Sequence, residues 1–152
     1  MAKMRFNWTV VIVFVIALVV LAVTAFSLRK WQVTRMGSKA LENGLKAYEN
    51  SHWEDAAENL GQYLSVNPSD VEILLKYAEA QLNIRPLKRN NIQQAIAAYR
   101  GVLRVKRNNI TATDKLVSLY LQMNIPTEAE LIAKRYLQEN ESANIRLSLI
   151  HI

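Results

Sequence analysis

The sequence predicts an all-α chain in which a single transmembrane helix is followed by an α-solenoid of about three helix pairs. Three observations lead to this fold class. An apolar run without charge occupies residues 8–28, and small residues recur behind it at spacings of 12 and 34. The chain also holds only four Gly and three Pro, which suits long helices better than a loop-rich β fold.

The apolar run has the properties of a membrane span. No residue between Arg5 and Arg29 is charged, and Trp8 and Trp31 bracket the run where interfacial aromatic residues usually lie. About 20 such residues cross the hydrocarbon core as a helix, which satisfies its own backbone hydrogen bonds there. We therefore predict a short basic N-terminus at 1–7, a transmembrane helix at 8–28 and a basic juxtamembrane linker at 29–36.

The alternative for this run is a cleaved signal peptide, because Val23-Thr24-Ala25 resembles a cleavage site. The run exceeds the usual signal core of roughly 7–15 residues, which favours an uncleaved anchor. Its orientation has two interpretations. Counting Lys and Arg on the flanks favours repeats in the cytoplasm. A short basic N-terminus before one span is typical of a signal-anchor with the repeats outside, and we expect this second arrangement.

The remainder of the chain repeats itself. Gly44, Ala56 and Pro68 are 12 residues apart, Ala78 follows Gly44 by 34, and Ala129 follows Ala95 by 34. The interval between Ala78 and Ala95 is 17, so the middle unit carries five extra residues. The predicted units are 37–70, 71–109 and 110–143, and we expect the inserted segment, 83–91, to form a surface loop.

The spacing has a packing reason, because two helices of a hairpin approach closely only where one presents a small side chain. Large residues, among them Tyr99 and Tyr120, would fill the space around those contacts. Ser69 or Asp70 is available to cap the helix that follows Pro68. We assign repeat packing to Gly44, Ala56, Pro68, Ala78, Ala95, Tyr99, Tyr120 and Ala129.

Over residues 37–143 this pattern resembles the tetratricopeptide repeat (TPR) family, whose unit has 34 residues. The first unit matches well, whereas the second has Arg107 in place of Pro and the third has Val117 and Glu141 at marked positions. A short anchor joined to such repeats resembles large, uncharacterised bacterial membrane TPR proteins. The resemblance implies a single-pass protein of the bacterial inner membrane.

The end of the chain is a separate case. Residues 144–152 do not complete another helix pair, and 147–152 resemble a translated sequencing adapter. We therefore expect these last six residues to be a scar and the natural protein to continue.

Catalytic chemistry is not indicated. His52 and His151 are the only imidazoles and have no partners at a recognisable spacing, and the chain has no Cys or Gly-rich phosphate loop. We expect no catalytic residue, no cofactor and no metal site.

The first helices of TPR units line a concave groove, and the resemblance implies a candidate peptide-binding groove here. Its predicted lining carries five acids against two bases, with leucines between them, which suits a peptide with Lys or Arg around apolar anchors. The groove residues are Leu41, Glu42, Leu45, Glu49, Glu72, Leu75, Lys76, Glu79, Leu82, Asp114, Lys115, Ser118 and Leu121.

We therefore expect a non-enzymatic, membrane-anchored scaffold that binds protein or peptide partners, for example in envelope assembly. One alternative is the docking or regulatory part of a larger enzyme. Another is a binder of nucleic acid or anionic lipid through the basic stretch at 85–107, which holds seven Lys and Arg and no acid. Nucleic acid is disfavoured because Tyr99 alone interrupts that stretch with an aromatic ring, and the repeat needs it for packing.

Overall fold

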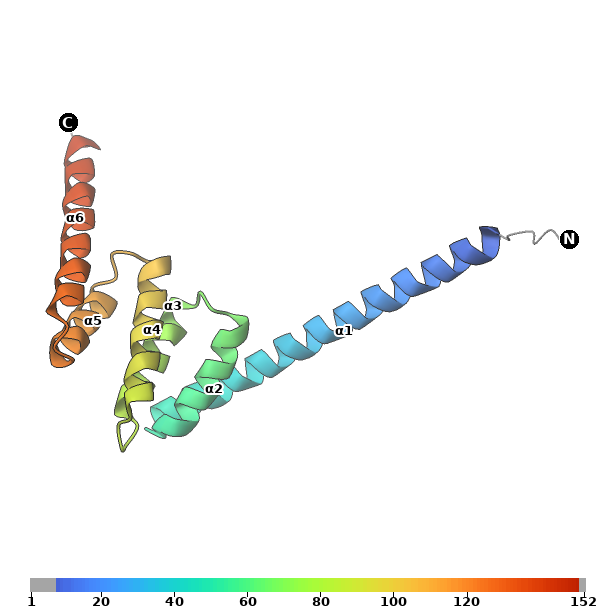
Figure 1. Ribbon diagram of the computed structural model, residues 1–152, viewed down its shortest axis with the longest axis horizontal. Coiled ribbons are helices and arrows are strands. Elements are labelled where there is room, and N and C mark those ends of the chain that lie inside the picture. The colour runs from blue at the N-terminus through green and yellow to red at the C-terminus, as the bar shows by residue number, and fades with distance from the viewer. Residues whose placement is uncertain (1–7, 151–152) are drawn as a thin grey trace, which may run out of the picture.

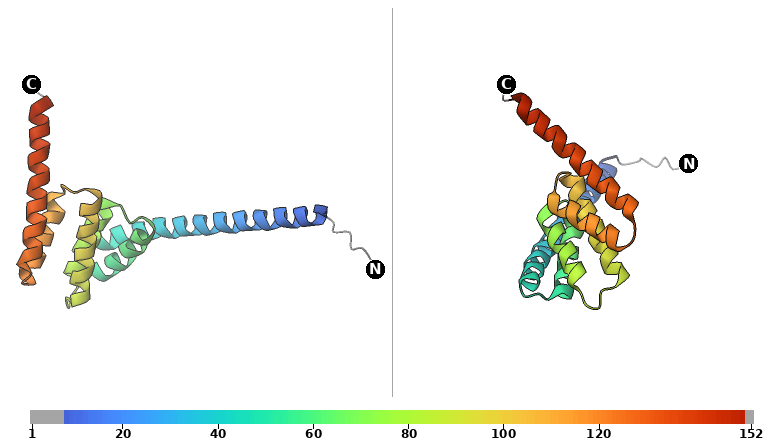
Figure 2. Two further views of the ribbon diagram at one scale, coloured as in Figure 1. Left: turned by 45° about the horizontal axis from the view of Figure 1, so that its top comes forward. Right: turned by 90° about the vertical axis from the view of Figure 1, so that its left-hand side faces the viewer.

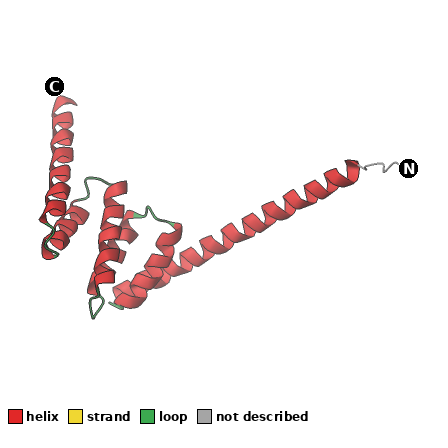
Figure 3. Cartoon of the chain, in the orientation of Figure 1, coloured by secondary structure: helices red, strands yellow, loops and turns green. Residues whose placement is uncertain are grey.

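The computed structural model describes the backbone of residues 8–150 and the side chains of residues 17–21, 24 and 35–140. All regular structure within these residues is helical (Figure 1, Figure 3). The helices are α1 (Trp8–Glu49), α2 (Trp53–Val66), α3 (Val71–Asn83), α4 (Arg89–Val105), α5 (Ile110–Gln122) and α6 (Pro126–Ile150). The prediction of an all-α fold is confirmed for these residues.

The helices pack in successive pairs. The C-terminal part of α1 packs on α2, α3 packs on α4, and α5 packs on α6, while α2–α3 and α4–α5 join one pair to the next. Figure 2 shows the pairs stacked at one end of α1, whose other end extends away from them. We call the side formed by α1, α3 and α5 the first-helix face and the side formed by α2, α4 and α6 the second-helix face.

The small residues lie where the helices meet. A Cβ atom added to Gly44 would lie 2.6 Å from Leu60 Cδ2 and 3.0 Å from the Leu60 backbone nitrogen, so α1 and α2 leave no space for a side chain there. Ala56, Ala78 and Ala95 are completely buried. The close approach of paired helices therefore depends on the residues that recur in the sequence.

Larger side chains fill the space around these contacts. Leu60, Val102 and Leu116 are the largest fully buried side chains, and one continuous core runs from Leu60 to Ile132. Tyr99, Tyr120 and Ala129 also lie in this core. Pro68 is exposed, in the turn between α2 and α3.

Two turns of the fold are the same structure. Ser51, between α1 and α2, and Asn124, between α5 and α6, both have a φ of 58°. In each turn the next backbone N–H donates to a carbonyl five residues earlier: His52 to Ala47 and Ile125 to Tyr120. This is the hydrogen bond of a Schellman helix end. The first and third helix pairs are therefore closed by equivalent turns.

The middle pair is connected differently. We expected a surface loop over 83–91, but α3 continues to Asn83 and α4 begins at Arg89, so the loop is shorter. The reason is Asn91, whose Oδ1 accepts a hydrogen bond from the Lys88 N–H and whose Nδ2 donates to Gln81 Oε1. These bonds cap α4 and attach it to α3, because they satisfy polar groups at the helix start. The N-caps of α3 and α5 are Asp70 and Asn109, which accept from the Ile73 and Ala112 N–H groups.

Helix α1 is continuous through residues 29–36, which we predicted to be a linker. This segment has no Pro, so nothing interrupts the backbone hydrogen bonds of the helix. Most side chains of the predicted span at 8–28 lie outside the described residues. The predicted basic N-terminus at 1–7 and the side chains of 144–152 lie outside them as well. Among the residues that are described, no helix meets the length and hydropathy expected of a membrane span.

Candidate interaction surfaces

The predicted groove residues all lie on the first-helix face, in the C-terminal part of α1, in α3 and in α5. The acidic members are exposed: Glu42, Glu49, Glu72, Glu79 and Asp114. The leucines of α1 and α3 are only partly buried and pack against the core: Leu41, Leu45, Leu75 and Leu82. On α5, Ser118 is partly buried, whereas Lys115 is exposed and Leu121 is 57% exposed. The apolar part of this surface is therefore mostly shared with the core.

A polar cluster joins α1 to α3 on this face. Tyr48 donates a hydrogen bond of 2.5 Å to Glu79 Oε2, and Lys76 Nζ lies 5.3 Å from the centre of the Tyr48 ring. Lys76 also forms an ion pair of 3.5 Å with Glu72. The ring and the three charged side chains restrain one another, because each holds the next in a fixed position.

Two tyrosines of this region have perturbed acidity. Partial burial, together with the hydrogen bond to Glu79 and the negative charge of its carboxylate, raises the pKa of Tyr48 to about 12. Burial raises the pKa of Tyr99 to about 12 as well, and the nearby Glu79 carboxylate adds to the shift. Both phenols are neutral at physiological pH, where Tyr48 donates its hydrogen bond to Glu79 and Tyr99 packs in the core.

The sequence interpretation missed Tyr48. The residue follows Leu41 by seven positions and Leu45 by three, which places it on the same face of α1. That spacing was sufficient to predict that Tyr48 lies beside the groove residues of α1. With the cluster in place, Glu42, Glu49 and Asp114 are the acids of this face that form neither an ion pair nor a side-chain hydrogen bond within the described part of the chain.

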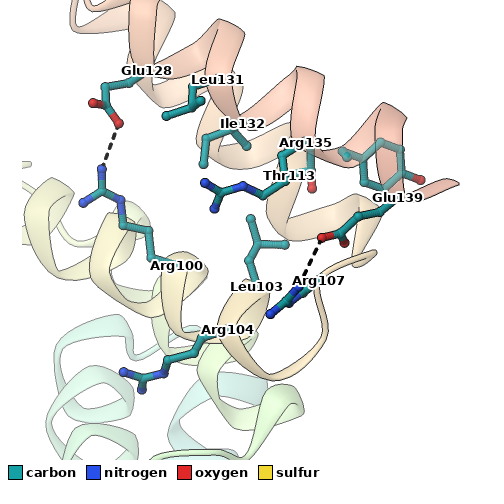
Figure 4. Close-up of a pocket in the computed structure, with 11 residues that line it drawn as sticks. Arg100, Leu103, Arg104, Arg107, Thr113, Glu128, Leu131, Ile132, Arg135 and Glu139 are labelled. Atoms are coloured by element: carbon teal, nitrogen blue, oxygen red, sulfur yellow. Dashed lines mark hydrogen bonds and ion pairs between the residues drawn. The ribbon is translucent and has the colours of Figure 1, made fainter. Parts of the chain in front are cut away.

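The basic stretch at 85–107 is divided among several elements. Arg85 and Lys88 belong to the loop before α4, whereas Arg100 and Arg104 are on α4 and Arg107 follows it. The last three line an open cavity of about 590 Å³ between α4 and α6 (Figure 4). The sequence interpretation did not predict this cavity or its residues from α6.

Metal and catalytic sites are not apparent in the described residues. His52 is exposed at the turn before α2. No three His, Asp or Glu side chains in the described part of the chain gather in the way a metal ion requires.

Comparison with known proteins places the fold. No protein-family model and no curated protein matches the chain. Solved structures of MamA, a TPR protein, do match it. MamA AMB-1 superposes with a TM-score of 0.58 and 21% sequence identity, over 73% of this chain and 58% of that one. MamA MSR-1 superposes with a TM-score of 0.57 and 19% identity, over 70% of this chain and 59% of that one.

The similarity to MamA is limited both in the length that it covers and in sequence identity. The chain spans less than two thirds of these two MamA structures, and at such identity the similarity concerns the fold. The order of the helix pairs, their buried small residues and the superposition all indicate the same fold. The chain has a TPR-like helical-repeat fold similar to that of MamA.

Proposed function

We propose that this protein is a non-enzymatic, membrane-anchored scaffold whose first-helix face binds a basic peptide segment of a partner protein. The observation that carries the proposal is the set of exposed acids on α1, α3 and α5, which gives the groove residues five acidic against two basic side chains. Surfaces of opposite charge attract one another and reject wrong partners.

The chemistry of the face selects a class of peptide. Glu42, Glu49 and Asp114 have no ion pair in the described chain, so their carboxylates are available to Lys or Arg of a partner. Leu121 offers exposed apolar surface at the α5 end. We infer that the partner presents an apolar side chain flanked by Lys or Arg, since helical grooves hold segments of that kind.

Membrane attachment is the second part of the proposal. Leu18, Val19, Val20 and Leu21 are each more than half exposed, and four successive helix positions point in all directions around the axis. Thr24 Oγ1 donates to the Val20 and Leu21 carbonyls at 3.0 Å, so its hydroxyl is satisfied within the helix. These features suit a helix surrounded by lipid, where every polar group needs an internal partner.

Partner binding can be tested by site-specific photo-crosslinking in native membranes. A benzoylphenylalanine residue at Lys115 is expected to crosslink a protein partner, and one at Asp55, exposed on α2, is expected to give no such product. Reversing charge with Glu42→Lys and Glu49→Lys should reduce the Lys115 crosslink at least fivefold, because the partner's basic residues are then repelled. The matched pair Glu54→Lys and Glu58→Lys, exposed on α2, should leave it unchanged. An equal loss in both double variants contradicts the proposal.

Anchoring and orientation need a separate measurement. We propose a single-pass protein of the bacterial inner membrane with the repeats outside the cytoplasm, a position that suits envelope assembly. The full chain should stay in the membrane fraction after extraction at alkaline pH, and protease added to spheroplasts should digest residues 36–146. Release by alkali contradicts the anchor, and protection of the repeats contradicts the orientation.

A further inference from the structure

We infer that the cavity between α4 and α6, on the second-helix face, is a second docking site and that its occupant is an acidic peptide segment of a partner protein. The site is distinct from the first-helix face. It has the opposite charge, it lies between helices of different repeat units, and its residues were not predicted to bind anything.

Regular spacing on two helices builds the walls. Arg100, Arg104 and Arg107 are at intervals of four and three, so they form one side of α4 and the turn after it. The α6 side has the same kind of spacing and contributes Glu128, Leu131, Ile132, Arg135 and Glu139. Figure 4 shows Arg100, Leu103, Ile132 and Arg135 facing the space between the two helices, with Arg104 extending to the side of it. A volume of about 590 Å³ is within the usual range for a ligand site.

The charges of the cavity are only partly neutralised. Arg100 Nη2 pairs with Glu128 Oε2 at 3.1 Å, and Arg107 Nη1 lies 3.8 Å from Glu139 Oε1. Arg104 and Arg135 form no ion pair within the described residues. The lining therefore has four arginines against two glutamates, which leaves two guanidinium groups for a ligand.

Arginine is suited to this purpose. Its planar guanidinium binds a carboxylate through two parallel hydrogen bonds and retains its charge at any physiological pH. Arg100 is held in place from two sides, since its guanidinium also lies 5.5 Å from the centre of the Tyr120 ring. The Arg100–Glu128 pair is thus a fixed edge of the cavity, and Arg104 and Arg135 are its available anion-binding groups.

The cavity also has an apolar component. Leu103, Leu131 and Ile132 lie between the charged residues, and Leu131 is 51% exposed although it belongs to this lining. Exposed apolar surface surrounded by arginine is typical of protein–protein contact regions. The occupant is therefore expected to carry an apolar side chain between two Asp or Glu residues.

Arg104 connects this cavity to its surroundings. The same side chain lines a smaller cavity of about 250 Å³ at α2, α3 and α4, together with Gly61 and Pro68. An extended segment lying on α4 can thus follow the second-helix face from one unit to the next. At about 3.3 Å per residue, three or four residues cover the length from Arg100 to Arg107.

Lipid and nucleic acid fit this surface less well. With the proposed anchor at 8–28, the repeats begin at 37, nine residues further along α1, a distance of about 14 Å that exceeds the screening length of roughly 8 Å. Nucleic acid presents a continuous series of phosphates, which Glu128 and Glu139 in the walls would repel. Separate carboxylates on a peptide can pair with Arg104 and Arg135 and avoid both glutamates.

The test begins with a display library of random 12-residue peptides, selected on the full chain in lipid nanodiscs. The expected result is enrichment of sequences with at least two acids around an apolar residue. A fluorescein-labelled copy of the most enriched peptide should bind at least tenfold more weakly to the Arg104→Glu, Arg135→Glu double variant, and its affinity for the parent chain should fall with added NaCl. The neutral pair Arg104→Gln, Arg135→Gln should give a smaller loss in the same direction.

A matched control distinguishes the site from overall charge. Arg89→Glu with Lys106→Glu changes the net charge equally at exposed positions outside the cavity and should alter affinity less than twofold. Circular dichroism verifies that each variant keeps its helices. The inference is overturned if no acidic bias emerges, or if both charge-reversed pairs weaken binding equally. It is also overturned if the binding of polyuridine or of phosphatidylserine vesicles requires Arg104 and Arg135 and the binding of the peptide does not. The Glu42→Lys, Glu49→Lys variant should bind the acidic peptide normally, so this result is independent of the first-helix face.

Discussion

Gly44 illustrates how one side chain determines the packing of a helix pair. Replacing it with Ala normally stabilises a helix, because Ala loses less conformational freedom. At this position the new Cβ would lie 2.6 Å from Leu60 Cδ2 and 3.0 Å from the Leu60 nitrogen, so backbone as well as side chain must move.

We therefore expect Gly44→Ala to lower the free energy of unfolding by about 1–3 kcal/mol, the usual cost of overpacking. Gly37→Ala is the control, since a Cβ there has no atom within 4 Å, and it should be neutral or stabilising by up to about 1 kcal/mol. Urea unfolding of the full chain in detergent, followed by circular dichroism, measures both. Equal effects would contradict a close contact at Gly44.

Tyr48 and Tyr99 predict a dependence of stability on alkaline pH. The pKa of each phenol is raised to about 12, whereas tyrosine in an unfolded chain has a pKa of about 10. Between these values the folded state retains protons that the unfolded state has lost. The resulting stability is fully present below pH 10 and disappears as pH rises towards 12.

The measurement is the free energy of unfolding at pH 9, 10 and 11. It should decrease across this range in the parent chain, and Tyr48→Phe and Tyr99→Phe should each make the decrease less steep. Comparing each variant with its own value at pH 9 separates titration from lost packing. If the free energy of unfolding decreases equally steeply with pH in the parent chain and in both variants, the pKa values of Tyr48 and Tyr99 are not raised.

At the scale of helices and turns, the equivalent turns at Ser51 and Asn124 provide a direct comparison. Both residues have positive φ, a conformation that Asn adopts more readily than Ser and that Gly adopts without steric cost. Ser51→Gly should therefore raise the melting temperature by more than Asn124→Gly. We expect a gain of at most about 1 kcal/mol for Ser51→Gly. Thermal unfolding of the two variants and of Ser51→Val, which should be destabilised, tests this ranking.

The helices show which local features can be predicted from sequence. The 12- and 34-residue spacings identified the small residues that the structure buries, because close helix packing requires them at fixed positions. Asp70 was one of two candidate caps and is the residue that caps α3. The start of α4 was misplaced, since it depends on a hydrogen bond between Asn91 and Gln81 in another helix.

The two candidate sites also differ in how far they could be predicted from the sequence. The residues of the first-helix face could be listed from the sequence because the resemblance to TPR units implies that the first helix of each unit lines a groove. The α4–α6 cavity depends on two helices of different units, with Arg100 opposite Glu128, 28 positions later. No local pattern indicates which residues meet across such a distance. The predicted linker at 29–36 is part of helix α1, because basic residues do not end a helix and neither Pro nor Gly lies in this segment.

For the molecule as a whole, an unbroken α1 predicts a fixed distance between the N-terminal segment and the repeats. The chain has no natural Cys, so Leu21→Cys and Lys39→Cys permit two specific spin labels at exposed positions. These sites are 18 residues, or five helical turns, apart, and their Cα atoms should be separated by about 27 Å. Pulsed electron resonance on the full chain in nanodiscs should give one narrow distribution near this length. A broad distribution would indicate a hinge within 29–36.

The absence of a joint in α1 has a geometric consequence for anything the repeats hold. A helix turns by about 100° for each residue, so the number of residues between the proposed membrane span and Gly44 determines the direction in which the two proposed binding faces point. Inserting two alanines at residue 33 would rotate the repeats about the axis of α1 by about 200°. Inserting four would leave them within about 40° of their original orientation and move them about 6 Å along the axis. With the proposed span in the membrane, a partner bound to the repeats would lie at one fixed height above the bilayer and on one fixed side of α1.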